Sequence, residues 1–206
     1  MRISALLLAL FAFPCVAQDS AAPNPYLLCS GCHGAQGEGN LDVKAPPLAG
    51  QSATYVARQL ANYKHGQRAY RETDEAGQVM KAIAMTLQDD AATLNVADFI
   101  SKMPRTATPP PAPVGPTMPG RPGEGRRIYA ACAGCHGSSG EGKADANAPN
   151  IALLPAWYLT KALQDFRVGA RGSHPDDYEG RTMSRLVRMI PDDQSLQDVV
   201  AYVDAL

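Results

Sequence analysis

The chain has 206 residues, which is enough for one large domain or two small ones. Its 19 Lys and Arg residues nearly balance 20 Asp and Glu residues, for a formal net charge of −1. This balance excludes the basic excess on which nucleic-acid binding depends. Only five cysteines are present, so each of them can be assigned in turn.

The first 17 residues have the pattern of a cleaved signal peptide. A basic residue precedes an apolar run over residues 3–13, which is too short to span a bilayer, and small residues then lead to Ala17. Pro14 does not suit a lipoprotein signal at Cys15, so we predict cleavage after Ala17 rather than lipidation. The mature protein is therefore expected in the periplasm, with its N-terminal domain over residues 18–103.

A short helix is expected to lead into the motif Cys-Ser-Gly-Cys-His at residues 29–33. Two cysteines three positions apart, followed directly by histidine, are the attachment signature of c-type haem. Cys29 and Cys32 are therefore predicted to bind haem covalently, and His33 to be the proximal ligand of its iron. A zinc ribbon would need a second cysteine pair about 15–20 residues away, and a thioredoxin-like site would need strands that the pattern does not show.

Beyond this motif, apolar residues recur at helical spacing. They predict a helix from Tyr55 to Tyr63 that ends at Gly66, and a last amphipathic helix near Ile100. Neither half of the chain shows the alternation of a β-strand, so we expect an all-α fold. Eight prolines within residues 104–123 predict a semi-rigid linker after the first domain.

The second domain, residues 124–206, repeats the first at a fixed offset of 103 positions. Cys132, Cys135 and His136 match the first haem motif. Further matched pairs follow without a gap: Tyr55 with Tyr158, Leu60 with Leu163, Gly66 with Gly169, Arg68 with Arg171, and Met80 with Met183. A fixed internal period indicates a tandem duplication, so we predict two covalently bound haem c groups, one in each domain.

The sixth ligand of each iron must come from elsewhere in the domain. Cys15 leaves with the signal peptide and the other four cysteines attach haem, so no cysteine remains as an axial ligand. Met80 and Met183 are equivalent in the repeat, each 47 residues after its histidine, and we predict that they bind the iron. The unmatched candidates are given other roles: His65 and His174 at the surface, and Met85 and Met189 in the core.

Histidine and methionine together leave the iron no open position for a substrate. The neutral thioether also favours ferrous iron and raises the reduction potential relative to a second imidazole. We therefore expect a one-electron carrier at each haem and no enzyme activity. Its partners would be transient redox proteins, a donor and an acceptor.

The two copies resemble cytochrome c4, a family of dihaem periplasmic electron carriers. The resemblance rests on the haem motifs and on a shared pattern: Tyr55, Gln59, Leu60, Tyr63, Gly66, Arg68, Met80 and Leu87 in the first copy, and Tyr158, Leu163, Phe166, Gly169, Arg171 and Met183 in the second. Ala162 and Ile190 depart from that pattern.

The resemblance implies two class I cytochrome c domains that carry electrons between respiratory partners, for example from a quinol:cytochrome c reductase to a terminal oxidase. It also implies that Tyr55, Tyr158, Arg68 and Arg171 hydrogen-bond the haem propionates. The alternative for these four residues is that the arginines lie at the surface and the tyrosines in the core.

A dedicated electron-transfer subunit of a larger oxidoreductase is the main alternative function. The haem subunit of flavocytochrome sulfide dehydrogenase resembles the same family, and such a subunit would bind a flavoprotein. A dihaem thiosulfate dehydrogenase is less favoured because those enzymes ligate one haem by cysteine, and a dihaem peroxidase would be longer. Peripheral association with the membrane is compatible with the sequence.

Overall fold

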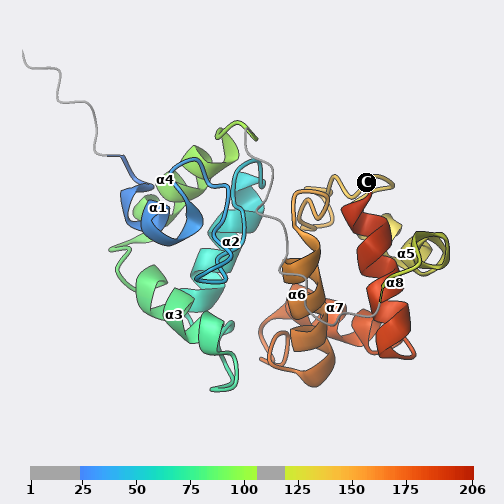
Figure 1. The fold of residues 1–206 in the computed structure, drawn as a ribbon. Coiled ribbons are helices and arrows are strands. Elements are labelled where there is room, and N and C mark those ends of the chain that lie inside the picture. Colours follow the sequence, from blue (N-terminus) through green and yellow to red (C-terminus); the bar gives the residue numbers. More distant parts are fainter. Residues whose placement is uncertain (1–23, 106–118) are drawn as a thin grey trace, which may run out of the picture.

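The computed structural model describes residues 24–105 and 119–206. The predicted signal peptide and residues 106–118 of the predicted linker lie outside the described residues. Two four-helix domains stand side by side (Figure 1). Their helices are α1 (Leu27–His33), α2 (Ala53–Lys64), α3 (Glu75–Ala84) and α4 (Asp90–Ser101), then α5 (Pro122–His136), α6 (Ala156–Val168), α7 (Tyr178–Val187) and α8 (Asp193–Asp204).

The prediction of an all-α fold is confirmed for the described residues. Their only extended pairings are two isolated β-bridges, Asn40 with Ala45 and Lys143 with Ala148, which are themselves equivalent in the repeat. None of the helices in this part of the chain is long and apolar enough to cross a membrane.

Three helix pairs begin 103 residues apart, as the duplication requires: α2 with α6, α3 with α7, and α4 with α8. The first pair is not matched in length, because α5 begins at Pro122, inside the predicted linker, whereas α1 begins at Leu27. Proline suits the first helical position, where its missing N–H is not needed. The extra turns of α5 pack along α8.

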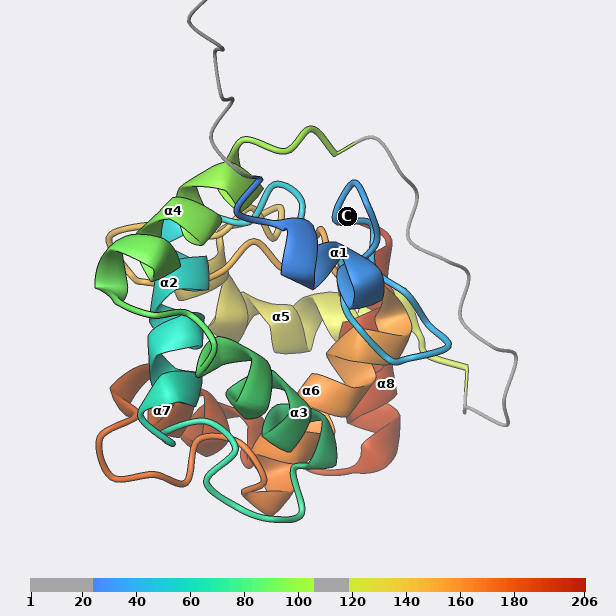
Figure 2. The same ribbon diagram turned by 90° about the vertical axis from the view of Figure 1, so that its left-hand side faces the viewer.

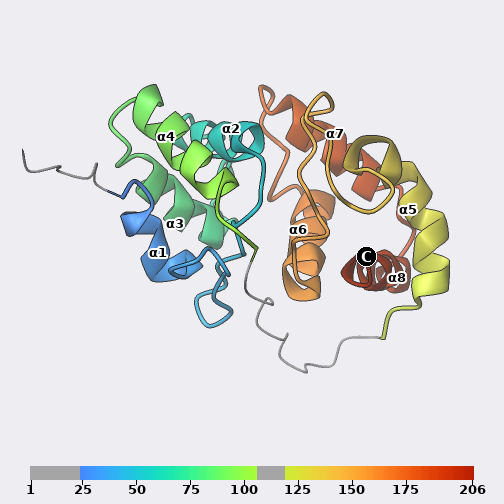
Figure 3. The same cartoon turned by 90° about the horizontal axis from the view of Figure 1, so that it is seen from above.

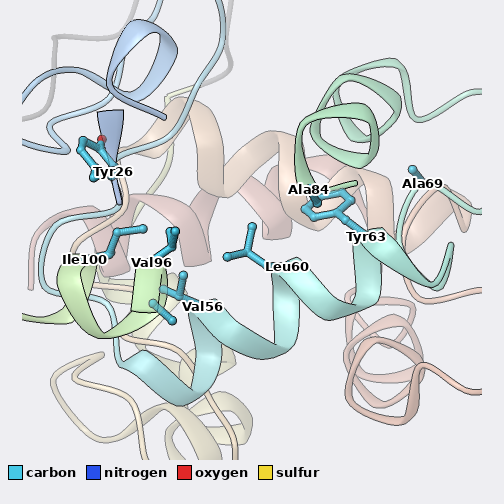
Figure 4. Packing of buried hydrophobic residues seen from close by; sticks show 9 residues of the cluster. Tyr26, Val56, Leu60, Tyr63, Ala69, Ala84, Val96 and Ile100 are labelled. Carbon is cyan, nitrogen blue, oxygen red and sulfur yellow. The ribbon is translucent and has the colours of Figure 1, made fainter. Parts of the chain in front are cut away.

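Each domain has its own apolar core. In the N-terminal domain α2 packs on α4 and α3, and the side chains between them come from all parts of that domain (Figure 4). Tyr26 is fully buried there and stacks on Phe99 with ring centroids 6.1 Å apart. In the C-terminal domain Tyr129 occupies the equivalent place and packs against Tyr202 at 5.2 Å.

The boundary between the domains is formed by α2 on one side and by α6 and α7 on the other (Figure 3). Viewed from the N-terminal side, α1, α3 and α4 lie in front of the second domain (Figure 2). Residues near α2 are therefore placed to contact the C-terminal domain.

The role predicted for Met85 and Met189 was wrong. Met85 and Met189 are 63% and 78% exposed, so neither fills the core. Met85 is the C-cap residue of α3, and Met189 lies two residues after the end of α7.

Candidate haem-binding sites

The two Cys-x-x-Cys-His motifs end α1 and α5 in the same way. Cys29 is half-buried and packs against the N-terminal core, whereas Cys32 is exposed one turn later. Cys132 and Cys135 repeat this pattern in the second domain. None of the four is in a disulfide, so all four sulfur atoms are available for thioether bonds.

The histidine rings that follow are buried and held in one orientation. His33 Nδ1 lies 2.8 Å from the carbonyl oxygen of Pro46, and His136 Nδ1 lies 3.1 Å from that of Pro149. A carbonyl only accepts hydrogen bonds, so Nδ1 carries the proton and Nε2 keeps the lone pair that binds a metal. Burial lowers the pKa of both imidazoles, which favours this neutral form.

The loops that present these carbonyls depend on glycine. Gly39 has φ +85° and donates its N–H to the carbonyl of His33 at 2.8 Å. A side chain at Gly39 would collide with the backbone at Pro47. The carbonyl that orients the ring of His33 thus lies thirteen residues after it, at Pro46.

Met80 and Met183 lie on equivalent turns of α3 and α7, two helices that the sequence did not predict. Both side chains are half-buried, and Met80 packs against the N-terminal core. The helices are fixed by Asp74 and Asp177, whose carboxylates each accept the backbone N–H of the glycine three residues later at 3.0 Å. An aspartate three residues before a glycine was the signal that could have revealed both helix starts.

Of the two arginines implied by the family resemblance, Arg171 is buried and Arg68 is half-buried. The Arg171 residue is 9% exposed, and its guanidinium lies 4.4 Å from the centre of the Phe166 ring. The Arg68 guanidinium lies 4.2 Å from the centre of the Tyr63 ring and donates to Gln59 Oε1 at 2.8 Å. In both arginines Nε is buried without a hydrogen-bond partner in the protein.

These arginines meet the two tyrosines at the domain boundary. Burial raises the pKa of Tyr158, but the charges of Arg171 and Arg68 outweigh it and hold that pKa below its ordinary value. Burial alone lowers the pKa of Arg171, whereas the phenols of Tyr158 and Tyr55 raise it, and the net shift is upward. The four residues therefore form one cluster built from both domains.

This cluster fits the acidic edge of a haem. A buried N–H without a partner costs free energy, and a buried guanidinium calls for an anion. Among the described residues no carboxylate pairs with Arg68 or Arg171, so the donors suit a carboxylate from a bound group. Together with the cysteines and the oriented imidazoles, the residues present fit one haem in each domain.

Sequence reasoning missed a further set of residues at the boundary, Gln51, Arg58 and Asn62. Arg58 donates to Glu179 Oε1 at 3.2 Å and to the carbonyl of Asn147 at 2.7 Å, both in the other domain. These three residues could have been recognised because they differ from their counterparts in the second copy, which are Leu154, Lys161 and Asp165. Positions that differ between the two copies are not detected when the copies are matched for identical residues.

The chain is similar to known proteins along most of its length. The cytochrome c family model matches the chain twice, over residues 26–104 and 123–206. Cytochrome c4 of Thiocapsa roseopersicina is 30% identical over 183 residues, which is 87% of each chain. The thiosulfate dehydrogenase electron acceptor of Stutzerimonas stutzeri is 30% identical over 185 residues, 85% of this chain and 77% of the relative.

A solved structure gives the same result. Cytochrome c4 of Acidithiobacillus ferrooxidans matches with a TM-score of 0.65 and 27% identity, over 88% of this chain and 99% of that one. The predicted fold of two tandem cytochrome c domains and the predicted cofactor, two covalently bound haem c groups, are confirmed. The chain belongs to the cytochrome c family and, within it, to the dihaem cytochromes c4.

Proposed function

We propose that the protein is a periplasmic electron carrier that takes up one electron at each haem and has no enzyme activity of its own. The observation that carries this proposal is that His33 and His136 have the same environment. Both rings are buried, and both present Nε2 to a metal because a prolyl carbonyl engages Nδ1. Each site is thus prepared for a permanent iron ligand rather than for proton transfer.

In this proposal Cys29 and Cys32 attach the first haem, and Cys132 and Cys135 attach the second. His33 with Met80 and His136 with Met183 are the axial pairs. When bound, the haems supply one-electron redox chemistry at the iron. Arg68 and Arg171, with Tyr55 and Tyr158, hold the propionates through guanidinium and phenol donors and exclude water from the shared boundary.

The axial pairs are tested by the near-infrared spectrum of the ferric holoprotein. Sulfur-to-iron charge transfer gives a weak band there, and we expect an intensity that corresponds to two methionine-ligated haems. An intensity for one haem, or the absence of the band, would refute the symmetrical assignment.

A second candidate function is that of a dedicated electron acceptor for one dehydrogenase. Its support is the similarity to proteins named thiosulfate dehydrogenase electron acceptor, in Stutzerimonas stutzeri and Thiomonas intermedia. A flavoprotein dehydrogenase would fit the same role. Pull-down from periplasm distinguishes the two functions, because a dedicated acceptor is recovered in a stable complex with its dehydrogenase, whereas a general carrier is recovered alone.

A further inference from the structure

The two domains meet in a nearly two-fold arrangement. Gly50 faces Leu153, which is its own counterpart in the repeat, so closely that a Cβ on Gly50 would be in van der Waals contact with the leucine. A residue touches its own counterpart only near a two-fold axis. The charge interactions of Tyr158 with Arg68 and of Arg171 with Tyr55 are likewise exchanged by this symmetry.

Polar contacts nevertheless tie the boundary together mainly along one edge. Besides the two hydrogen bonds of Arg58, Asn62 Nδ2 donates to Asp177 Oδ1 at 3.4 Å, and Gln51 Nε2 donates to the carbonyl of Asn150 at 2.5 Å. Gln51 and Asn62 are 2% and 6% exposed, so these are interior contacts. We call Gln51, Arg58 and Asn62 the inter-domain clamp.

On the opposite edge the equivalent residues do not reach across. Lys161, the counterpart of Arg58, pairs at 2.6 Å with Asp165 of its own helix. Ala76 stands where Glu179 would be needed, and Leu154 replaces Gln51. Within residues 24–105 and 119–206, neither Lys161 nor Asp165 has a hydrogen bond to the other domain.

Asp165, the counterpart of Asn62, makes contact between the domains unfavourable at this second edge. The symmetry that pairs Asn62 with Asp177 would pair Asp165 with Asp74, two carboxylates. Asp74 is 3% exposed, and its Oδ2 is buried without a hydrogen-bond partner. Like charges across a boundary oppose its closure, so the edge at Asp74 and Asp165 lacks the attraction present at the clamp.

We propose that the inter-domain clamp positions the two haem domains for electron exchange within the molecule. This proposal rests on the proposed function, since it assigns these residues to the passage of electrons between the two sites. Joining two domains in one chain raises the effective concentration of each near the other, and contacts at their boundary then determine the relative orientation. The clamp supplies that orientation from one edge, without touching the residues assigned to either iron.

The test uses two matched double variants of the holoprotein: Arg58→Ala with Asn62→Ala on α2, and Lys161→Ala with Asp165→Ala at the equivalent positions of α6. NMR of half-reduced protein measures intramolecular exchange from the broadening of haem methyl signals, independently of protein concentration. The α2 variant should exchange at least about tenfold more slowly, because the rate of electron transfer depends steeply on the distance and orientation of the two haems. The α6 variant removes no attractive contact across the boundary, so its exchange rate should not fall below about half that of the wild type.

The near-infrared band of each variant shows whether both haems keep their methionine ligands. Slow exchange in a variant with an intact band supports the role of the clamp in positioning the domains. Equal rates in the two variants, whether slow or unchanged, would overturn it. A wild-type protein in which carbon monoxide rapidly occupies an iron would instead refute the proposed function. The two failures are therefore distinguishable.

Discussion

His33 and His136 show how much of the chemistry at each site depends on one hydrogen bond. The carbonyls of Pro46 and Pro149 fix both the tautomer and the plane of the imidazole. Neither ring faces a carboxylate there, so neither imidazole gains the basicity that a carboxylate partner would give. A neutral imidazole with a neutral thioether is the pairing expected of a high-potential haem.

Met80 and Met183 are open to a direct test at the same scale. We expect Met80→His to lower the reduction potential of the first haem by on the order of 100 mV or more, because a second imidazole stabilises ferric iron better than a thioether does. Met183→His should do the same for the second haem alone. Spectroelectrochemical titration of each holoprotein measures both potentials.

Met85→His and Met189→His are the matched controls, since both methionines are largely exposed. Neither should change a potential by more than a small fraction of that shift. If a control variant produced the large shift, the alignment of the repeats at the ligand helix would be wrong.

At the scale of elements, α5 is tied to α8 by one buried carboxylate. Asp198 is 1% exposed and accepts from the backbone N–H of Arg121 at 2.8 Å and from its guanidinium at 2.6 Å. Gln194 donates to the same carboxylate at 2.8 Å. The hydrogen bonds from Arg121 hold the pKa of Asp198 well below its usual range.

The sign of the resulting pH dependence follows from that lowered pKa. An unfolded aspartate titrates near pH ~4 and the folded one lower, so the stabilisation is present above about pH 4 and is lost as the pH falls through the folded pKa. We expect Asp198→Asn to lower the unfolding temperature by several degrees at neutral pH, and the difference from wild type to narrow at about pH 2–3. Circular dichroism melts of the holoprotein at both pH values check this.

Asp98→Asn provides the control, because Asp98 is an exposed carboxylate paired with Lys102 on α4. Exposed ion pairs contribute little, so its unfolding temperature should change by a degree or two at most. A difference for Asp198→Asn that stayed constant from neutral to acidic pH would contradict the assigned role of its charge.

The elements also show what a single sequence can and cannot predict. α2 and α6 were predicted because apolar spacing and a terminal glycine are local signals, and the haem motifs because covalent attachment needs adjacent residues. α3 and α7 were missed because each is only 10 residues long, so its apolar spacing repeats few times. The caps at Asp74 and Asp177 are the local signals of where they begin. The clamp was missed because contacts between domains depend on how the two folded units meet.

At the scale of the whole molecule, the duplication gives two domains of similar fold that contribute different residues to the boundary between them. One edge has the clamp, and on the other edge the repeat symmetry would place Asp165 opposite Asp74. We expect Asp165→Asn to restore on the second edge the amide–carboxylate hydrogen bond that Asn62 and Asp177 make on the first. The free energy of unfolding should then contain a favourable coupling of about 0.5–1 kcal/mol between Asn at 165 and Asp74.

A double-mutant cycle measures that coupling. Asp165→Asn and Asp74→Ala are made singly and together, and chemical unfolding is followed for each holoprotein. Asp74→Ala also removes the cap of α3, and the cycle cancels that loss because it occurs in both backgrounds. A coupling of zero would show that these two side chains do not meet across the boundary.

Rapid mixing of the fully reduced holoprotein with carbon monoxide tests most directly whether both irons have closed axial positions. If His33 with Met80 and His136 with Met183 occupy both axial positions, no iron is open, and carbon monoxide should bind slowly or not at all. The protein should at the same time exchange electrons rapidly with a high-potential redox partner. Rapid, stoichiometric conversion of one ferrous haem to its carbon monoxide complex would reveal an open position and contradict the assignment of a carrier.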